Sequence, residues 1–230
     1  STNKLETNIT NNLTYNSTDF ISNSGFKNNF GINLKNLNSV GKKSSKYKSS
    51  LQSELVSLYN LDVSLPLKKN NQKSINYLTP KLSLRFNPHD MKDYSSLSRN
   101  IDAHNAFAIN RLGLSDTFES GRSLTLGLDY SNEQKNNLNE INNYFELKLA
   151  TVLRDREEKF IPKKSTINKK NSNLFGSINN KFSENLEIGY NFSLDNDINT
   201  LEYNNINTTF SINNVVTKFN FIEENGERGE

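Results

Sequence analysis

The residues best suited to chemistry lie in one stretch, DAHNAFAINRLGLSDTFESG, residues 102–121. It contains His104 two residues after Asp102, and the only other histidine, His89, precedes Asp90. A Ser–His–Asp relay needs a nucleophile that the fold presents to the histidine, and no G-x-S-x-G turn occurs in the sequence. We therefore expect both histidines to make ordinary loop hydrogen bonds.

The same stretch carries two carboxylates three residues apart, Asp116 and Glu119. Paired carboxylates can cleave glycosidic bonds, but Arg111 and Arg122 lie close enough in sequence to neutralise them. A salt-bridge network within a loop is the interpretation we favour. Cysteine is absent, and neither metal-ligand spacing nor a phosphate-binding glycine loop is present. We expect no enzyme, no metal and no cofactor.

Composition limits the fold to a small set of classes. Only 33% of the 230 residues are hydrophobic, yet the chain has 14 Phe and 9 Tyr in regular positions, which favours one-sided β-structure over disorder. The net charge of +3 is too small to indicate a nucleic-acid partner. No apolar run is long enough for a transmembrane helix.

Hydrophobic residues on both sides of residues 102–121 alternate with a period of two. Between Leu51 and Leu65, for example, apolar side chains point one way and polar ones the other, and Leu124–Tyr130 repeats the pattern. Such runs predict about ten strands, namely residues 5–15, 26–34, 51–65, 78–86, 124–130, 141–153, 174–182, 186–194, 201–212 and 215–222. Pro80 lacks a backbone donor, so we expect it at a sheet edge or a bulge.

The connections between these strands alternate in length. Short turns, including one expected at residues 132–139, alternate with a long loop at 87–122 and a basic loop at 154–170. Long loops at one end and short turns at the other are typical of outer-membrane barrels. We predict an all-β antiparallel meander that forms part of a large transmembrane outer-membrane β-barrel. A soluble β-sandwich or solenoid, or a disordered chain, remains as an alternative.

A membrane barrel would turn its apolar strand face to lipid and its polar face to a wet lumen. The lumen-facing candidates are Glu146, Lys148, Glu187 and Asn191. In the basic loop, ammonium groups are either solvated or in contact with anionic headgroups outside the membrane. These candidates are Lys159, Lys163, Lys164, Lys169 and Lys170.

The central stretch resembles the barrel domain of the LptD family, the LPS-assembly or organic solvent tolerance proteins. The residues that carry the resemblance are Asp102, Asn105, Phe107, Asn110, Arg111, Asp116, Glu119 and Gly121, followed by the strand Leu124–Tyr130. The "LTP" at 78–80 and "SNLFG" at 172–176 also agree with the family pattern. In this sequence Gly113 falls one position early relative to the family glycine.

This resemblance implies a conduit that inserts lipopolysaccharide into the outer leaflet of a bacterial outer membrane. It also implies an LptE-like lipoprotein plug, and a periplasmic LPS-transport bridge that reaches the barrel through an N-terminal domain outside residues 1–230. We expect these residues to form a single segment from the middle of the barrel. A passive porin or scaffold barrel is the alternative, and a soluble secreted β-protein is a third.

The resemblance and the residues together predict a polar lock in the long loop. Asn110, Arg111, Asp116 and Glu119 would fix this loop in or over the lumen, while Phe107 and Ile109 would pack as one small apolar cluster.

Overall fold

The computed structural model describes residues 3–45, 47–136, 141–224 and 227–229 and confirms the predicted fold class. It contains a single 13-stranded sheet in which every strand pairing is antiparallel. The strands are β1 (Leu5–Asn16), β2 (Phe20–Ile21), β3 (Lys27–Lys42), β4 (Gln52–Ser64), β5 (Leu67–Asn70), β6 (Ser74–Asn87), β7 (Gly121–Lys135), β8 (Ile141–Arg154), β9 (Leu174–Ser183), β10 (Leu186–Leu194), β11 (Leu201–Ile212), β12 (Val215–Glu224) and β13 (Glu227–Gly229). Each of the ten predicted strands corresponds to one of the longer strands, and the sequence pattern missed the short β2, β5 and β13.

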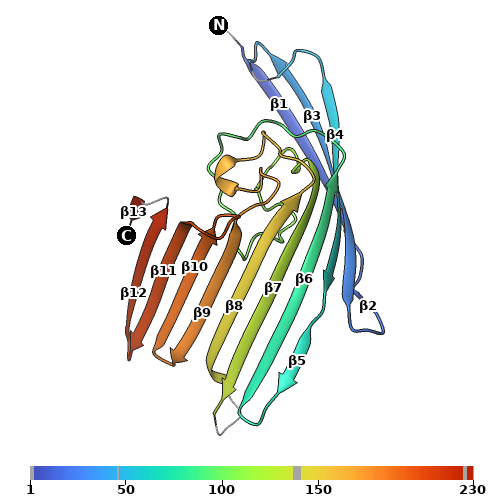
Figure 1. Ribbon diagram of the computed structural model, residues 1–230. Helices are drawn as coiled ribbons and strands as arrows, with labels where there is room; N and C mark the ends of the chain where they lie inside the picture. The colour runs from blue at the N-terminus through green and yellow to red at the C-terminus, as the bar shows by residue number, and fades with distance from the viewer. Residues whose placement is uncertain (1–2, 46, 137–140, 225–226, 230) are drawn as a thin grey trace.

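The strands follow one another across the sheet in chain order (Figure 1). The order is β1-β3-β4-β6-β7-β8-β9-β10-β11-β12-β13, with β2 paired to β3 and β5 paired to β6. Among the described residues, the first and last strands do not pair with each other, so the sheet is open. An open, curved meander of this kind is consistent with part of a large barrel.

Connections differ between the two ends of the sheet, as the sequence predicted. Residues 43–51, 88–120, 155–173 and 195–200 join strands at one end. At the other end the connections are residues 71–73, 184–185 and 213–214, together with residues 17–26, which contain the short β2. The long loop therefore occupies residues 88–120 and the basic loop residues 155–173. The turn expected at 132–139 was placed too early, because β7 continues to Lys135, and residues 137–139 lie outside the described part of the chain.

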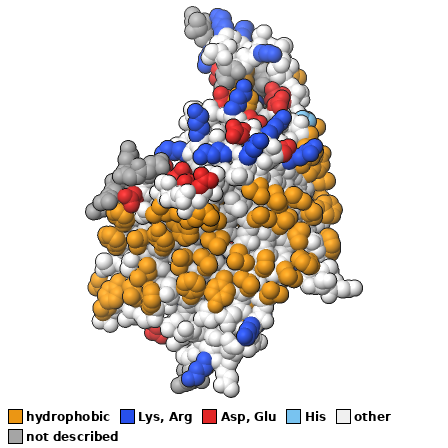
Figure 2. Space-filling model, in the orientation of Figure 1, with side chains coloured by type: hydrophobic (Ala, Val, Ile, Leu, Met, Phe, Trp, Pro, Cys, Tyr) orange, Lys and Arg blue, Asp and Glu red, His pale blue; other side chains and the backbone are white. Residues whose placement is uncertain are grey.

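The two faces of the sheet differ in what covers them. We call the face that packs against the long loop the inner face and the opposite one the outer face. Large apolar side chains such as Leu55, Leu84 and Phe219 remain exposed on the outer face. Figure 2 shows them as a band across the strands, with most of the Lys and Arg side chains gathered beyond it at the loop end.

Pro80 lies in an interior strand opposite a gap in strand pairing, and not at the sheet edge or bulge that the sequence predicted. β4 ends at Ser64 and β5 begins at Leu67, and both pair with β6 on either side of Pro80. Proline has no backbone N–H and cannot donate a hydrogen bond to a neighbouring strand. The break between β4 and β5 therefore lies where Pro80 could not have donated one. Its carbonyl still accepts from the Leu65 N–H at 3.0 Å.

The buried apolar residues lie where the loops meet the inner face, and they form two clusters, one on β8 and β9 and one on β3 and β4. One cluster contains Met91, Ile101, Ala103, Ala106, Leu112, Leu114, Ala150, Val152, Ile161, Ile167 and Phe175. A second contains Leu37, Val56, Leu58 and Phe118. No helix in the described residues is long and apolar enough to cross a membrane.

Candidate functional site

Arg111 makes the largest set of side-chain hydrogen bonds in the described part of the long loop, and its side chain is only 1% exposed. Its guanidinium donates to both Glu119 oxygens, from Nε to Oε2 at 2.7 Å and from Nη2 to Oε1 at 2.6 Å. The remaining donors reach the Ala106 carbonyl at 3.1 Å, Thr125 Oγ1 at 2.9 Å and Ser123 Oγ at 3.0 Å. The five N–H groups thus all have acceptors, which makes this buried cation tolerable.

Arg154, the last residue of β8, is a second cation in contact with Glu119. It donates to Glu119 Oε1 and to the Ser120 carbonyl. Burial alone would raise the pKa of the Glu119 carboxyl, but the two guanidinium groups outweigh it and lower the pKa to about 2. Glu119 is therefore ionised at neutral pH, as the predicted salt-bridge network requires. The partner is Arg111 and not Arg122, which instead lies over the Phe86 ring at 5.5 Å from its centroid.

Two further cations of the sheet hold the backbone of the long loop. Arg85 on β6 donates to the carbonyls of Phe107 at 3.0 Å, Ala108 at 2.6 Å and Ile109 at 3.3 Å. Lys35 on β3 donates to two more loop carbonyls, those of Leu114 and Thr117. A charged donor on a backbone carbonyl is stronger than a neutral one, so the sheet fixes the path of the loop through its main chain.

Sequence reasoning missed Lys35, Arg85 and Arg154 as site residues. Alternation places Lys35 and Arg85 on the polar face, but it does not say which polar residues meet a loop that is distant in sequence. A second signal was available in the apolar residues that interrupt the polar face, Val56, Leu58, Ala150 and Val152. They mark the area that the loops cover.

Phe107 and Ile109 do not form one cluster, which corrects the prediction. Phe107 packs against the larger cluster and Ile109 against the smaller one. The Phe107 ring lies on the backbone of Gly127 in β7, where an added Cβ would be 2.6 Å from ring atom Cε2. Lys81 covers the ring, with its Nζ 4.5 Å from the ring centroid. Phe107 and Ile109 thus hold the long loop against the sheet at two separate points.

Asp102, Asn105 and Asn110 shape the loop locally. The Asp102 carboxylate accepts from the backbone N–H groups of His104 and Asn105 at 2.8 Å each, an Asx-type turn. Asn110 bonds both the N–H and the carbonyl of Leu114, each at 2.9 Å. The His104 ring contacts Ser177 Oγ at 3.0 Å, so its partner is not Asp102.

Gly121 ends the loop with φ of +78°. An L side chain is strained in this region, and an added Cβ would also approach Arg154 Nη2 at 3.2 Å. The glycine therefore lets the chain enter β7 beside the buried guanidinium.

Asp116 does not share partners with the Arg111–Glu119 pair, so the residues predicted to form one lock make two separate sets of contacts. Its carboxylate accepts from Lys92 Nζ at 3.0 Å and from the Tyr94 hydroxyl. Burial and the Asp116 carboxylate together raise the pKa of Tyr94 to about 12. Asp116 and Glu119 thus have separate partners, Lys92 and Tyr94 for the first and Arg111 and Arg154 for the second. Asn110 likewise supports the turn at Leu114, without a bond to Arg111.

The long loop and the basic loop pack together as one unit. Ser120 donates to Glu158 Oε2 at 2.6 Å, and the Tyr94 N–H donates to the Phe160 carbonyl at 2.9 Å. Ile161 and Ile167 of the basic loop, each 0% exposed, complete the larger apolar cluster. The buried half of the basic loop therefore stabilises the long loop directly.

The five lysines of the basic loop are all exposed but fall into two groups. Lys163, Lys164 and Lys169 line a cavity beside β9–β11, and Lys164 forms an ion pair with Glu224 at 3.2 Å. Lys159 and Lys170 do not line this cavity, and Lys159 instead lies over the Phe160 ring. Contact with headgroups stays a prediction for all five.

The four residues expected to face the lumen share the inner face. Lys148 and Glu146 lie two and four positions before Ala150, which is buried under the loops. The register β8–β9–β10 places Lys148 opposite Ser177, and Ser177 opposite Asn191. Glu187 lies four residues before Asn191 on β10 and therefore on the same face, where it accepts from the Tyr144 hydroxyl at 2.7 Å. Whether this face borders a lumen remains a proposal.

The described residues contain no group of three His, Asp or Glu side chains that could hold a metal ion. The charged side chains of Arg111, Arg85 and Lys35 hold the long loop against one face of the sheet. Comparison with known families shows that the model of LptD, LPS transport system D, matches residues 6–226. No curated protein matches the sequence.

Proposed function

The chain belongs to the LptD family of the LPS transport system, and from this premise we propose that its sheet forms part of the wall of an outer-membrane conduit for lipopolysaccharide. In this proposal the apolar outer face contacts membrane lipid. The polar inner face contacts the hydrophilic sugars of the lipid in transit, and its acyl chains leave sideways into the bilayer. No covalent step is required, so the chain acts as a transport and assembly protein.

The observation that carries the proposal is the contrast between the two faces of the sheet. The outer face exposes large side chains such as Leu55 (57%) and Phe219 (54%). A soluble sheet would cover such a face with a second layer, whereas a membrane barrel leaves it to lipid. The opposite face carries buried polar side chains, including Asn33, Ser83 and Thr125.

The long loop argues against a passive porin. Arg111, Arg85 and Lys35 fix it against the inner face of the strands between β3 and β8. A loop held by buried charges narrows the path for water at that end. We propose that it closes the conduit to solutes while lipid passes elsewhere, and that an LptE-like lipoprotein occupies part of the inner face that the loops leave uncovered. Delivery of lipid to this barrel from a periplasmic bridge belongs to the same proposal.

The test compares two adjacent residues of β8 in the full-length protein in its native outer membrane. A photocrosslinking amino acid replaces Glu146 on the inner face, and in a separate variant Leu147 on the outer face. Lipopolysaccharide adducts are expected at Glu146 only while transport is active. Any adducts at Leu147 should persist when transport is blocked, because that position meets lipid already in the membrane.

A correctly inserted barrel without adducts at Glu146 would contradict the conduit. The passive porin or scaffold would then be the better interpretation, and solute conductance through the purified barrel would support it.

A further inference from the structure

The sheet divides in two above the pairing of Tyr59 with Phe86, the last pair between β4 and β6 on the loop side. Beyond it, residues 52–58 of β4 pair with β3 alone in the part of the sheet that the structure describes. β6 ends at Asn87, and Pro88, which follows, has no backbone donor with which to continue the ladder. We call this division the fork.

β1, β3 and β4 continue past the fork as a separate three-stranded arm, which rises beyond the other strands at the loop end (Figure 1). The arm comprises residues 5–14, 33–42 and 52–58. One edge of its β4 segment therefore lacks a partner strand among the described residues.

The base of the arm carries side chains typical of a membrane boundary. Tyr59, Phe86 and Arg122 are neighbours on the outer face. The rings of Tyr59 and Phe86 stack 6.4 Å apart, and Arg122 lies over the Phe86 ring. Barrels carry aromatic girdles at their interfaces. Above this row, Asn36 bonds Ser53 across the outer face at 3.3 Å. Unpaired strand edges do not occur in hydrocarbon, so the arm lies in water.

Phe118 of the long loop connects the two sides of the fork. Its side chain is 5% exposed and packs with Leu37, Val56 and Leu58 of the arm. Its carbonyl accepts from Asn87 Nδ2, at the end of β6, at 3.2 Å. One residue thus holds the arm through its side chain and β6 through its main chain.

Lys35 of the arm fixes Phe118 in this position. Its Nζ lies 4.6 Å from the centroid of the Phe118 ring. The same ammonium group donates to the carbonyls of Leu114 at 2.8 Å and Thr117 at 3.2 Å. Contacts with the long loop therefore take the place of strand pairing between the arm and β6.

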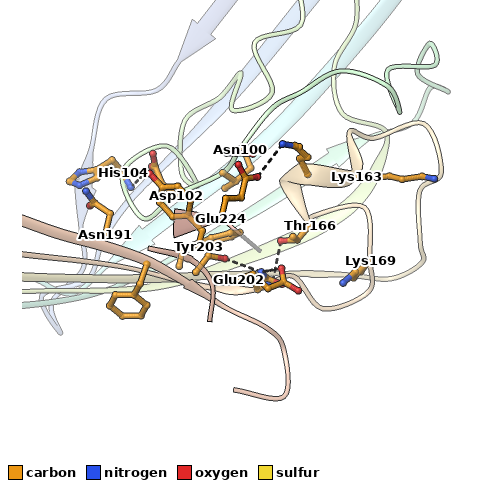
Figure 3. A pocket seen from close by; sticks show the side chains of 16 residues that line it. Asn100, Asp102, His104, Lys163, Thr166, Lys169, Asn191, Glu202, Tyr203 and Glu224 are labelled. Atoms are coloured by element: carbon orange, nitrogen blue, oxygen red, sulfur yellow. Dashed lines mark hydrogen bonds and ion pairs between the residues drawn. The ribbon is translucent and has the colours of Figure 1, made fainter. Parts of the chain in front are cut away.

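The arm is less closely packed further from its base. A cavity of ≈ 340 Å³ lies there, with Asn8, Ser39 and Glu54 of the arm on one side and Lys92 and Asp116 of the long loop on the other. Lys92 Nζ is 3.7 Å from Glu54, and such an exposed pair contributes little. The cavity beside β9–β11 (Figure 3) is separate, because its lining comes from the two loops and β9–β12.

We propose that the fork is a hinge in the sheet and that Phe118 is its clamp. With Phe118 in place the arm stays in line with β6 and the strands that follow. Without it the arm turns about the row of Tyr59 and Phe86, away from the long loop. Strands paired along their whole length resist this movement, whereas the β4 segment of the arm is paired on one side. The inference rests on the proposed function only for the position of the membrane. It does not require transport, so the hinge and the conduit can fail separately.

Double electron–electron resonance on the purified full-length protein in detergent measures the movement. Amino acids that carry spin labels replace Leu55 of the arm and Leu126 of β7, which are both exposed on the outer face. A second labelled pair, Leu126 and Phe210 of β11, lies entirely on the other side of the fork. Phe118→Ala should shift the distances between positions 55 and 126 to larger values and broaden them. The distances between positions 126 and 210 should stay unchanged, which also shows that the rest of the sheet is folded.

Phe107→Ala is the matched control, because it removes the same side chain from the same loop where the ring rests on Gly127, away from the fork. It should leave both distance distributions as they are in the unmodified protein. Lys35→Gln keeps the Phe118 ring and removes the cation over it, so it should give a smaller shift of the first pair. This variant decides the question if Phe118→Ala does not fold.

Three results would overturn the proposal. Unchanged distances between positions 55 and 126 in both Phe118→Ala and Lys35→Gln would exclude the hinge. An equal shift of both labelled pairs would mean that the whole sheet loosens. An equal shift of the first pair in Phe107→Ala would mean that any loosening of the long loop moves the arm, and that Phe118 is not the clamp.

Discussion

Arg111 and Glu119 form a buried two-bond pair inside the long loop, with donor–acceptor distances of 2.7 Å and 2.6 Å. Arg111→Ala would leave Glu119 buried with Arg154 as its remaining cationic partner. Removing one partner of a buried ion pair lowers the free energy of unfolding by roughly 3–5 kcal/mol. We expect the long loop of the purified protein to become sensitive to trypsin, and cells to admit large antibiotics.

Arg122→Ala is the control for that change, because Arg122 contacts the Phe86 ring and lies outside the pair. It should leave protease sensitivity and antibiotic uptake unchanged. Unaltered permeability in the Arg111→Ala strain, at normal protein abundance, would refute the lock.

Gly127 should tolerate a side chain only when Phe107 is removed. The added Cβ of Gly127→Ala would lie 2.6 Å from the Phe107 ring, and overpacking of this kind costs roughly 1–3 kcal/mol. In a Phe107→Ala background the steric cost should fall. A double-mutant cycle of thermal unfolding in detergent measures the coupling. Additive effects would mean that the ring does not rest on Gly127.

Acid should release the long loop only below pH 4.5. The folded pKa of Glu119, about 2, is below its ordinary value of 4.5. The ionised carboxylate therefore stabilises the folded loop above pH 4.5, and this contribution is lost as the pH falls from 4.5 towards 2. Pepsin digestion of the loop across this range should show the change.

Glu119→Gln serves as the reference for the acid experiment. It should be less stable than the unmodified protein at neutral pH, and it should lack the part of the acid-dependent loss that Glu119 causes. Parallel pH profiles for the two proteins would argue that other carboxylates control the loop.

A change in the basic loop should loosen the long loop. Ile161 is fully buried in the cluster that the two loops share, and Ile→Ala in a core costs roughly 2–5 kcal/mol. Ile161→Ala should therefore expose cleavage sites within residues 88–120, which mass spectrometry of the fragments would locate. Lys170→Ala, at an exposed position of the same loop, should not. New cleavage confined to residues 155–173 would show that the loops are independent.

Strand positions and faces could be predicted from sequence because burial on one face imposes a period of two. The pairing of Glu119 with an arginine was also predictable, since Arg111 is eight residues away in the chain. The sequence did not predict the loop contacts of Lys35, Arg85 and Arg154. Strand pairing brings these residues to the loop from distant positions in the chain. Asp116 was misplaced in the lock for the related reason that Lys92, 24 residues away, is its partner.

The position of Arg154 also bears on how the sheet assembles. Ser123 of β7, which contacts Arg111, is paired with Arg154 of β8. A slip of one residue between these strands would turn the Arg154 side chain to the outer face, where its charge would meet lipid and Glu119 would lose a partner. The contacts of Glu119 with both Arg111 and Arg154 therefore depend on the register of β7 and β8, so one loop carboxylate ties the fold of the loop to the alignment of two strands.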